Sequence, residues 1–382
     1  MRRLGIFVFY DKSGIVDGYV EYIITQLNKV LDDLIIVVNG DINEAGECIL
    51  KNYSTQFYKR DNTGLDAGAY ADVIVNLLGE EKLSQYDELV LCNDTFYGPF
   101  VSFEEIFTSM KNEKYDFWGI DGIKRNFLSY IVMYFCVFRG KLLKNGDLFN
   151  YFKSNVLFKV NEMADAFALL QVGLYYTLTQ KGYKPGLYTY SNGYQSKRNP
   201  DICVLEYNLP IWKKKFFLKD NYTDEICDKL VAHLESKKLY DTSLMKQNVK
   251  RVYGVEIGSE KKKFIGTDNV NQPEIKYSVP QITYDDINHF VSNHRQIYIY
   301  GAGSFARATA FVFLDKIEDF YGFIVSDEKN IKDRDIWGYP VIQASQVPPN
   351  SSIIVALNYE HSVEVLSWLG KNEHFFYFWD LK

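Results

Sequence analysis

Short strand-like runs alternate with helix-like runs over the first 120 residues, and this alternation constrains the fold more than any other feature. The pattern predicts strands at residues 5–10, 34–38, 55–59 and 88–92, whereas residues 16–31 carry apolar side chains at helical spacing. Strands that alternate with helices form a mostly parallel sheet. We therefore expect an α/β fold for this part of the chain.

Polar clusters follow all four of these predicted strands. In open α/β sheets, ligands bind beside the carboxyl ends of the strands. Any one cluster is equally typical of an ordinary turn, but their common placement at one sheet edge favours a binding site. The candidate binding residues in these clusters are Tyr10, Asp11, Asn39, Asp41, Asn62, Gly64, Asp66 and Asn93.

Composition and charge exclude several classes of function. A net charge of −6 gives no bulk attraction to a phosphate backbone, so nucleic-acid binding is not expected. The five cysteines have no paired spacing, which argues against a zinc site and against a disulfide framework. No histidine precedes His233, so a base or metal ligand in the N-terminal part has to be a carboxylate.

No stretch of the sequence is expected to enter or cross a membrane. The apolar run near the N-terminus is interrupted at Asp11 and Lys12, too early for a secretory signal. The longest other apolar run, Tyr130 to Phe138, has nine residues, whereas a membrane span needs about 20. We therefore expect a cytoplasmic protein.

Length and pattern together predict two domains, because 382 residues exceed the roughly 100–200 residues of one domain. Within the N-terminal part we also expect a strand at 129–138, a helix at 162–181 and a strand at 188–191. The predicted parts are a first domain at 1–252, a polar linker at 253–294 that includes Lys261-Lys262-Lys263, and a small α/β domain at 295–382. We expect the first domain to consist of a nucleotide-binding half at about 1–125, an acceptor half at about 126–205 and a helical extension to 252.

Asp94 is the candidate metal ligand. It follows a buried strand directly and precedes Tyr97-Gly98-Pro99, a turn-like segment that would keep the strand end open. The diphosphate of a sugar nucleotide is commonly neutralised by a divalent ion that one or two carboxylates hold. The alternative is that Asp94 caps the next turn or helix.

The segment from Asp61 to Tyr70 holds two glycines and two aspartates directly before a predicted helix. Backbone amides at a helix start attract anions, so this segment could face a ribose or a diphosphate. A helix start capped by Thr63 or Asp66 explains the same residues equally well.

Three segments, in this order, are similar to one known family: residues 61–70 (DNTGLDAGAY), 91–99 (LCNDTFYGP) and 116–119 (DFWG). With further matching segments at 129–139, 180–183 and 209–213, they resemble the rhamnan synthesis protein F family over about residues 1–252. Members of this family are glycosyltransferases of bacterial cell-wall and O-antigen polysaccharides.

The resemblance implies a GT-A-like nucleotide-diphospho-sugar transferase fold with a sugar nucleotide as substrate. Asp94 would stand where such enzymes bind a divalent metal, Mn²⁺ or Mg²⁺. Asn39 and Asp41 would lie near the base or ribose, and Asp66 beside the diphosphate. Asn93-Asp94-Thr95 offers one carboxylate where the wider superfamily usually has two, so the sugar-nucleotide site is better supported than the metal.

An inverting transfer needs a base that takes the proton of the acceptor hydroxyl, and in this half of the chain the base has to be Asp or Glu. Glu162 and Asp165 lie three residues apart on one face of a predicted helix, and Asp165 is our first candidate. Acidic residues also stabilise helix N-termini, so a structural role for this pair stays open. Asp121, just after residues 116–119, is the rival candidate.

The turn Gly301-Ala302-Gly303 follows a predicted strand and opens a predicted helix, and Asp327 ends the next strand. This is the context of a nucleotide-binding turn. Fewer than 90 residues follow the linker, about one mononucleotide-binding half, so we interpret the segment as a small Rossmann-like module without catalytic activity.

The basic and aromatic segment from Trp212 to Phe217 could rest on an anionic membrane surface, or it could cover the joint between domains. We expect a glycosyltransferase that moves rhamnose from dTDP-rhamnose onto a lipid-linked glycan, with peripheral contact at the inner face of the plasma membrane. Two alternatives stay open: an NAD(P)- or nucleotide-binding sugar-modifying enzyme centred on residues 295–382, and a non-catalytic scaffold that binds sugar nucleotides.

Overall fold

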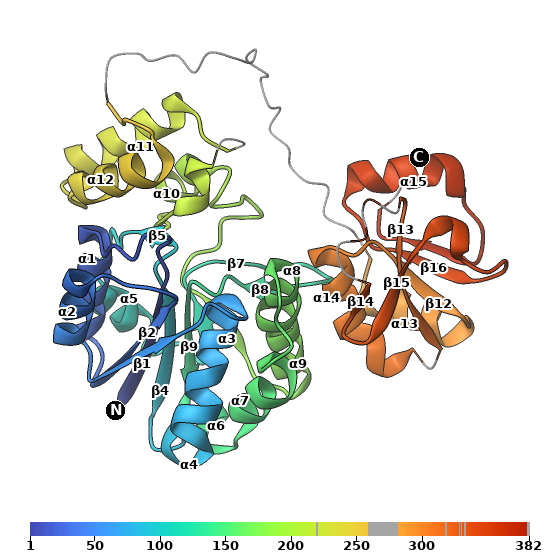
Figure 1. Cartoon of the computed structure of the whole chain (residues 1–382), viewed down its shortest axis with the longest axis horizontal. Coiled ribbons are helices and arrows are strands. Elements are labelled where there is room, and N and C mark those ends of the chain that lie inside the picture. The colour runs from blue at the N-terminus through green and yellow to red at the C-terminus, as the bar shows by residue number, and fades with distance from the viewer. Residues whose placement is uncertain are drawn as a thin grey trace. The chain divides into compact units, whose positions relative to one another are not determined.

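The computed structural model describes residues 1–218, 221–258, 282–317, 319–327, 329, 331 and 334–379, which form two compact units (Figure 1). Unit 1 contains the described residues of Met1–Ile123, Ile131–Lys153 and Tyr183–Tyr277. Unit 2 contains those of Lys124–Tyr130, Ser154–Gly182 and Ser278–Lys382.

Unit 1 is built on a seven-stranded sheet with the order β10-β6-β9-β4-β1-β2-β3. The strands are parallel except for β9, which runs antiparallel to both of its neighbours. Its central strands are buried on both faces, which explains their continuous apolar runs. The strands are β1 (Arg3–Phe9), β2 (Asp33–Asn39), β3 (Gln56–Arg60), β4 (Glu88–Asn93), β6 (Phe117–Gly119), β9 (Phe135–Arg139) and β10 (Pro185–Leu187).

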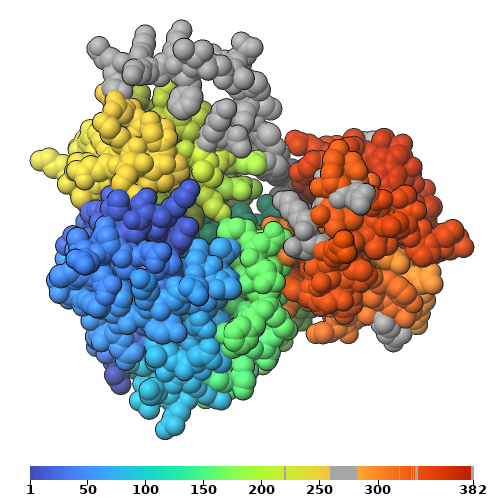
Figure 2. Space-filling model, in the orientation of Figure 1, coloured from blue at the N-terminus to red at the C-terminus, as the bar shows by residue number. Residues whose placement is uncertain are grey.

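Helices cover both faces of this sheet, with α1, α2 and α5 on one side of the strands and α3 on the other (Figure 1). The yellow residues of α12 lie against the blue N-terminal residues (Figure 2), where Arg251 binds Asp11 and Asp17. The helices are α1 (Gly18–Asn28), α2 (Glu44–Tyr53), α3 (Leu65–Ala71) with its π-helical continuation (Asp72–Leu78), α4 (Gly79–Leu83), α5 (Phe103–Met110), α6 (Gly140–Lys144), α7 (Asp147–Tyr151), α10 (Pro200–Leu205), α11 (Asp224–Ser236) and α12 (Thr242–Tyr253).

A second, two-stranded pairing extends the carboxyl end of β4. Strand β5 (Phe96–Tyr97) follows β4 closely and pairs antiparallel with β11 (Trp212–Lys213). Lys213 stands opposite Phe96, and the backbone N–H of Lys214 donates to the carbonyl of Thr95 at 3.0 Å. This pairing brings two lysines, more than 110 residues away in sequence, to the end of β4.

Unit 2 has a six-stranded sheet with the order β14-β15-β13-β12-β16-β17, parallel except for the β14–β15 pair. The strands are β12 (Ile297–Tyr300), β13 (Phe320–Val325), β14 (Asp335–Ile336), β15 (Tyr339–Gln343), β16 (Ser352–Val355) and β17 (Phe375–Tyr377). The helical elements include α8 (Met163–Asp165), its π-helical continuation (Ala166–Gly173), α9 (Leu174–Gln180), α13 (Tyr284–Asn293), α14 (Ser304–Phe313) with a short 3₁₀ turn (Leu314–Lys316), a second 3₁₀ turn (Ala344–Gln346) and α15 (Tyr359–Leu369).

Several predicted boundaries differ from the observed ones. The single strand predicted at 129–138 is wrong, because β8 (Tyr130–Ile131) and β9 are separated by a turn. The strand predicted at 188–191 lies instead at β10, three residues earlier. The helix at 162–181 belongs to unit 2, because its buried Ala168 and Val172 pack in the core of that unit.

Most of the predicted linker at 253–294, including Lys261-Lys262-Lys263, lies outside the described residues. Its last part is the amphipathic helix α13 of unit 2, whose Ile287, Phe290 and Val291 are buried. A Thr283–Asp286 capping box starts this helix.

Candidate active site

The segment Asn93-Asp94-Thr95 lies at the carboxyl end of β4 and is organised by Asn93. The Asn93 amide donates to Asp66 Oδ2 at 2.8 Å and accepts from the Thr95 hydroxyl at 2.7 Å. Asn93 is 4% exposed, so burial fixes these hydrogen bonds in place. The structure therefore joins the two predicted clusters around Asp66 and Asp94.

Asp94 lies in a compact charged contact with Lys214 and Tyr19. Asp94 Oδ2 accepts from the Tyr19 hydroxyl at 3.0 Å and from Lys214 Nζ at 3.2 Å. Lys214 Nζ also donates to the Tyr19 hydroxyl at 2.5 Å. Burial, together with the Asp94 charge, raises the pKa of Tyr19 well above its usual value, so this hydroxyl stays protonated.

Lys213 is a buried cation beside the same strand end. Its side chain is 8% exposed, its Nζ donates to the Thr95 hydroxyl at 3.2 Å, and it lies 4.3 Å from the centre of the Tyr134 ring. Burial lowers the pKa of Lys213 to about 7, and the Lys215 charge acts in the same direction. The charges of Asp121, Asp66 and Asp94 oppose this shift.

Asp121 follows β6 and is 4% exposed. Its carboxylate accepts from the Ser196 hydroxyl at 3.0 Å and from the backbone N–H of Gly122 at 2.8 Å. Burial raises the pKa of Asp121 to about 6, although these two hydrogen bonds favour the charged form. The Lys213 charge acts on it as well, so Asp121 belongs to the same group of charges.

Asp66 lies in the first turn of α3, two residues after Gly64, whose φ of 72° is in the left-handed region that glycine adopts readily. Burial raises the pKa of Asp66, while the Asn93 hydrogen bond lowers it. The helix start approaches the preceding loop closely, because a Cβ on Gly68 would lie 2.5 Å from the Thr63 carbonyl oxygen. A larger residue at position 68 would therefore clash with the loop that leads into the helix.

Asn39 supports this loop from the end of β2. Its amide accepts from Arg60 NH1 at 2.9 Å and donates to the Leu65 carbonyl at 3.0 Å. Arg60 also donates to Asp72 and to the Thr63 carbonyl. Both polar atoms of the Asn39 amide are thus engaged within the protein.

The other predicted binding residues of unit 1 lie farther from these contacts or have other partners. Tyr10 is 46% exposed. Asp11 binds Arg251 at 2.7 Å and accepts from two backbone N–H groups of its own loop. Asp41 and Asn62 are exposed, and Asp41 lies 3.7 Å from Lys59. Their predicted contacts with the nucleotide stay predictions.

The residues around Asp94 do not fit a divalent metal that the protein itself holds. Among the described residues, no group of three or more His, Cys, Asp or Glu side chains is arranged to hold a metal ion. One Asp94 oxygen already accepts two hydrogen bonds, one of them from a cationic ammonium. A divalent ion at the same oxygen would be repelled by Lys214.

Sequence reasoning did not identify Tyr19, Ser196, Lys213 and Lys214 as residues of this site. The lysines were recognised only as part of a basic and aromatic segment. A sequence signal was nevertheless present, because the three lysines interrupt a run of apolar aromatic residues, Trp212, Phe216 and Phe217, all of which are buried.

A comparison with family models shows which protein family this chain belongs to. The model of the rhamnan synthesis protein F family matches residues 34–300. The chain belongs to this family. Membership confirms the resemblance that the sequence motifs predicted and supports a glycosyltransferase-like function in polysaccharide synthesis. A search of curated proteins found no match.

Three solved structures are similar to this family member at low identity. A cytidylyltransferase from Leptospira borgpetersenii is 12% identical, with 69% of this chain and 100% of that chain covered and a TM-score of 0.34. A 4-diphosphocytidyl-2C-methyl-D-erythritol synthase is 13% identical, covering 49% and 89%, with a TM-score of 0.32. Glucosyl-3-phosphoglycerate synthase from Mycobacterium tuberculosis, in complex with Mn²⁺, UDP and phosphoglyceric acid, is 10% identical, covering 49% and 68%, with a TM-score of 0.29.

The family and the sheet order, rather than these low scores, support the fold assignment. The rhamnan synthesis F protein has the expected α/β fold, with a mostly parallel seven-stranded sheet in unit 1 and a smaller, mostly parallel sheet in unit 2. The four sequence clusters do follow β1, β2, β3 and β4, as predicted.

Glu162 and Asp165, two of the predicted catalytic residues of this family member, have structural contacts in unit 2. Arg307 of α14 binds both carboxylates, with 2.6 Å between Arg307 NH1 and Asp165 Oδ1. Asp165 is 1% exposed and also accepts from the backbone N–H groups of Asn161 and Glu162 at the start of α8. These contacts argue against the predicted base, because both carboxylates are engaged in binding Arg307 within unit 2.

The glycine turn of unit 2 is held by the same arginine. Gly301 has a φ of 116°, and a Cβ there would lie 3.0 Å from the Ala356 carbonyl oxygen. Arg307 Nε donates to the Ala302 carbonyl at 3.0 Å. Gly303 precedes α14, whereas Asp327 is exposed and pairs with Lys329 at 3.0 Å. Nucleotide binding by Gly301, Gly303 and Asp327 stays a prediction.

The membrane contact predicted for residues 212–217 is not supported, because Trp212, Lys213, Phe216 and Phe217 are buried. These side chains fill the core and the charged site instead of facing a lipid surface. Within the described part of the chain, no helix combines the length and the apolar character that crossing a membrane requires.

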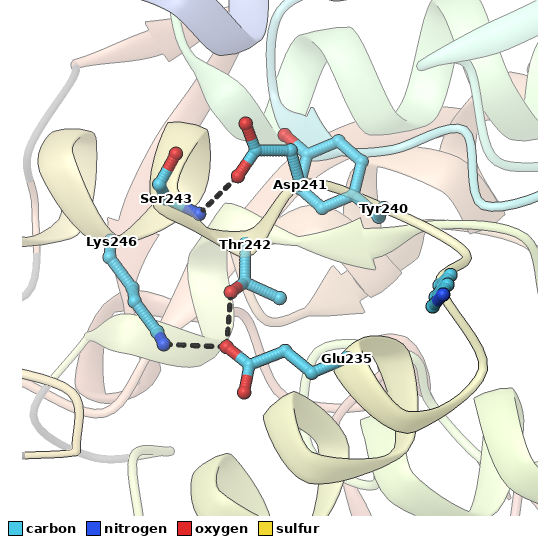
Figure 3. A pocket seen from close by; sticks show the side chains of 7 residues that line it. Glu235, Tyr240, Asp241, Thr242, Ser243 and Lys246 are labelled. Carbon is cyan, nitrogen blue, oxygen red and sulfur yellow. Dashed lines mark hydrogen bonds and ion pairs between the residues drawn. The ribbon is translucent and has the colours of Figure 1, made fainter.

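A pocket of about 560 Å³ lies at the turn between α11 and α12 (Figure 3). Its polar side chains bind one another: Glu235 accepts from Thr242 at 2.5 Å and from Lys246 at 2.7 Å. Asp241 caps α12 by accepting from the Ser243 backbone at 3.0 Å. These pairings stabilise the turn, so we do not include this pocket in the candidate site.

Proposed function

We propose that the protein is an inverting glycosyltransferase that moves rhamnose from dTDP-rhamnose to a hydroxyl of a cell-wall, capsule or O-antigen glycan carried on a lipid. The family supports the transfer of a sugar in polysaccharide synthesis. The single observation that carries the site is a hydrogen-bonded cluster at the end of β4, in which Asn93 binds Asp66, Lys213 binds Thr95 and Lys214 binds Asp94. Open α/β sheets bind their ligands at this edge.

Asp121 is the base in this proposal. Its pKa of about 6 leaves it charged at neutral pH while keeping it a better proton acceptor than an exposed aspartate. Asp165 and Glu162 are bound by Arg307, which leaves Asp121 as the strongest of the three predicted candidates. Asp121 would take the acceptor proton as the acceptor oxygen bonds to the anomeric carbon.

Asp121→Asn tests this role, because the amide keeps the shape of the side chain and cannot accept the proton. We expect transfer of radiolabelled rhamnose from dTDP-rhamnose to an extracted lipid-linked glycan to fall roughly 10²–10⁴-fold. Binding of dTDP, measured by calorimetry, should be kept. Lys229→Met, an exposed change on α11, serves as the control.

The donor is identified separately by thermal shifts with dTDP-, UDP- and GDP-sugars. A shift with dTDP-rhamnose greater than with the others supports the rhamnosyl assignment, and a greater shift with another donor replaces it. Normal transfer by Asp121→Asn would remove Asp121 as the base. A shift with NAD(P) and with none of the sugar nucleotides would contradict the proposed function.

A further inference from the structure

Two consecutive lysines are placed at the point where the proposed function requires neutralisation of a diphosphate. The β5–β11 pairing sets Lys213 and Lys214 beside Thr95 and Asp94. Because this placement depends on backbone hydrogen bonds between two buried segments, it does not depend on flexible surface side chains.

Lys214 has one N–H donor that its contacts with Asp94 and Tyr19 do not use. An ammonium group has three N–H donors, and the contacts with Asp94 and Tyr19 use two of them. The Lys214 side chain is 15% exposed, so part of it remains accessible from solvent. It can therefore remain anchored to Asp94 while it binds a further oxygen.

Lys213 is a cation that the protein satisfies poorly. Among the described residues, Thr95 is its one hydrogen-bond acceptor, and its other neighbour is the face of the Tyr134 ring. Burying an ammonium with one hydroxyl partner is unfavourable, so such a group is retained where a ligand completes its contacts.

Two buried hydroxyls lie in the same group of residues. Within the described part of the chain, Tyr70 and Tyr134 have hydroxyl groups without a hydrogen-bond partner, and both rings are at most 1% exposed. The charges of Asp66 and Asp94 act on Tyr70, and that of Asp121 acts on Tyr134. Unsatisfied buried donors next to a cluster of charges indicate a place that a polar ligand completes.

We propose that Lys213 and Lys214 bind the diphosphate of the donor and neutralise the departing nucleoside diphosphate, in the role for which related chemistry uses a divalent cation. This inference rests on the proposed function. In the transfer, the bond between the anomeric carbon and the β-phosphate oxygen breaks and its electron pair stays on that oxygen. The acceptor oxygen bonds to the anomeric carbon, and the acceptor proton goes to Asp121.

Asp94 then has a different role from the predicted metal ligand. It orients Lys214 toward the phosphate and is a positioning residue. The two models differ in what the Asp94→Asn variant does. If Asp94 holds a metal, the variant loses diphosphate binding. If it orients Lys214, the variant keeps binding, because the lysine remains and a neighbouring negative charge is removed.

The test is calorimetric binding of dTDP, UDP and GDP to the full chain, once with EDTA and once with MnCl₂. We expect at least one diphosphate to bind equally well in both conditions. Lys213→Met and Lys214→Met should each weaken it by roughly tenfold or more, as loss of a charge-assisted hydrogen bond requires. The same variants should weaken binding of the matching nucleoside monophosphate much less. Lys229→Met should leave the affinities for the diphosphate and the monophosphate unchanged.

Two further variants guard against unfolding, which Lys214→Met could cause by leaving Asp94 buried without its cation. Lys214→Arg should restore most of the diphosphate affinity. The double variant Asp94→Asn with Lys214→Met should fold, as judged by its thermal transition, and still bind diphosphate weakly. Strong binding by this folded double variant would overturn the inference.

The remaining outcomes separate the inference from the proposed function. Diphosphate binding that requires Mn²⁺ and is lost in Asp94→Asn overturns the lysine assignment and leaves the glycosyltransferase in place. Absence of binding by dTDP, UDP and GDP in both conditions overturns the proposed function, and the inference with it.

Discussion

At the scale of single residues, the chemistry of this site depends on side chains whose charge is set by burial. Asp121 and Lys213 are both less than a tenth exposed, and burial moves their pKa values toward each other, to about 6 and about 7. The two groups therefore change charge close to neutral pH, where an exposed aspartate and an exposed lysine would not.

The pH dependence of transfer tests the assignment of Asp121. A base acts when deprotonated, so kcat/KM should rise with pH through about 6. Because Lys213 loses its positive charge above a pH of about 7, kcat/KM should fall again at higher pH. The Ser196 hydroxyl lowers the pKa of Asp121, so Ser196→Ala should move this rise to higher pH by about one unit. Ser243→Ala, an exposed change on α12, should not move it. A profile that is the same in Ser196→Ala would contradict the assignment.

Lys213→Met is expected to stabilise the protein. The pKa of Lys213 falls to about 7 on folding, so between the unfolded value and pH 7 the unfolded chain binds a proton that the folded chain does not. The loss of free energy of unfolding caused by burying charged Lys213 is therefore greatest at and below pH 7. This loss disappears as pH rises toward the pKa of the lysine in the unfolded chain. Denaturant unfolding at pH 7 should show a gain of roughly 1–3 kcal/mol.

The exposed variant Lys229→Met should show no such gain. A Lys213→Met protein that is less stable than wild type at pH 7 would mean that the contacts with Thr95 and the nearby carboxylates outweigh the cost of burial.

At the scale of elements, short segments place the important side chains. Strand β11 has only two residues, yet its pairing with β5 decides where Lys213 lies. In unit 2, the start of α8 and the side of α14 are joined through Asp165 and Arg307. Carboxylates at helix starts thus have different roles in the two units. Asp66 belongs to the candidate site, where it binds Asn93, whereas Asp165 binds Arg307 of α14.

Asp165→Ala should destabilise unit 2. The change removes the side-chain acceptor at the start of α8 and one partner of buried Arg307, a loss of about 3–5 kcal/mol for a broken buried ion pair. Denaturant unfolding followed by circular dichroism measures it, with Glu364→Ala on the exposed face of α15 as the control. If Asp165→Asn is as stable as the wild-type protein but no longer transfers sugar, Asp165 rather than Asp121 would be assigned as the base.

At the scale of the whole molecule, the chain has separate apolar cores. One core lies among the elements of unit 1, and a core of unit 2 includes residues from all three of its chain segments. Proteins with more than one core commonly unfold in more than one step. A single melting temperature would therefore describe this protein incompletely.

Scanning calorimetry should resolve two unfolding transitions. The ligand dTDP should raise the temperature of the transition of unit 1 only, because a ligand stabilises the structure that binds it. Asp165→Ala should lower the other transition. A single transition that dTDP and Asp165→Ala both move would show that the two units unfold together.

Local sequence patterns were sufficient for much of the framework. Strands β1, β2, β3 and β4 and the polar clusters after them were predictable, because strand period and turn chemistry are local properties. The break between β8 and β9 was not, since both strands and the residues between them form one apolar run. The change in direction there depends on which neighbours each strand pairs with.

The sequence alone determined the α/β class, the family motifs and the placement of Asp66 and Asp94 at strand ends. Only the tertiary structure decided the partners of each charge: Asp94 with Lys214, Asp121 with Ser196, and Asp165 with Arg307. The physical reason is distance along the chain. These partners lie 75 to 142 residues apart, and pairing between segments so far apart depends on packing that no local pattern records.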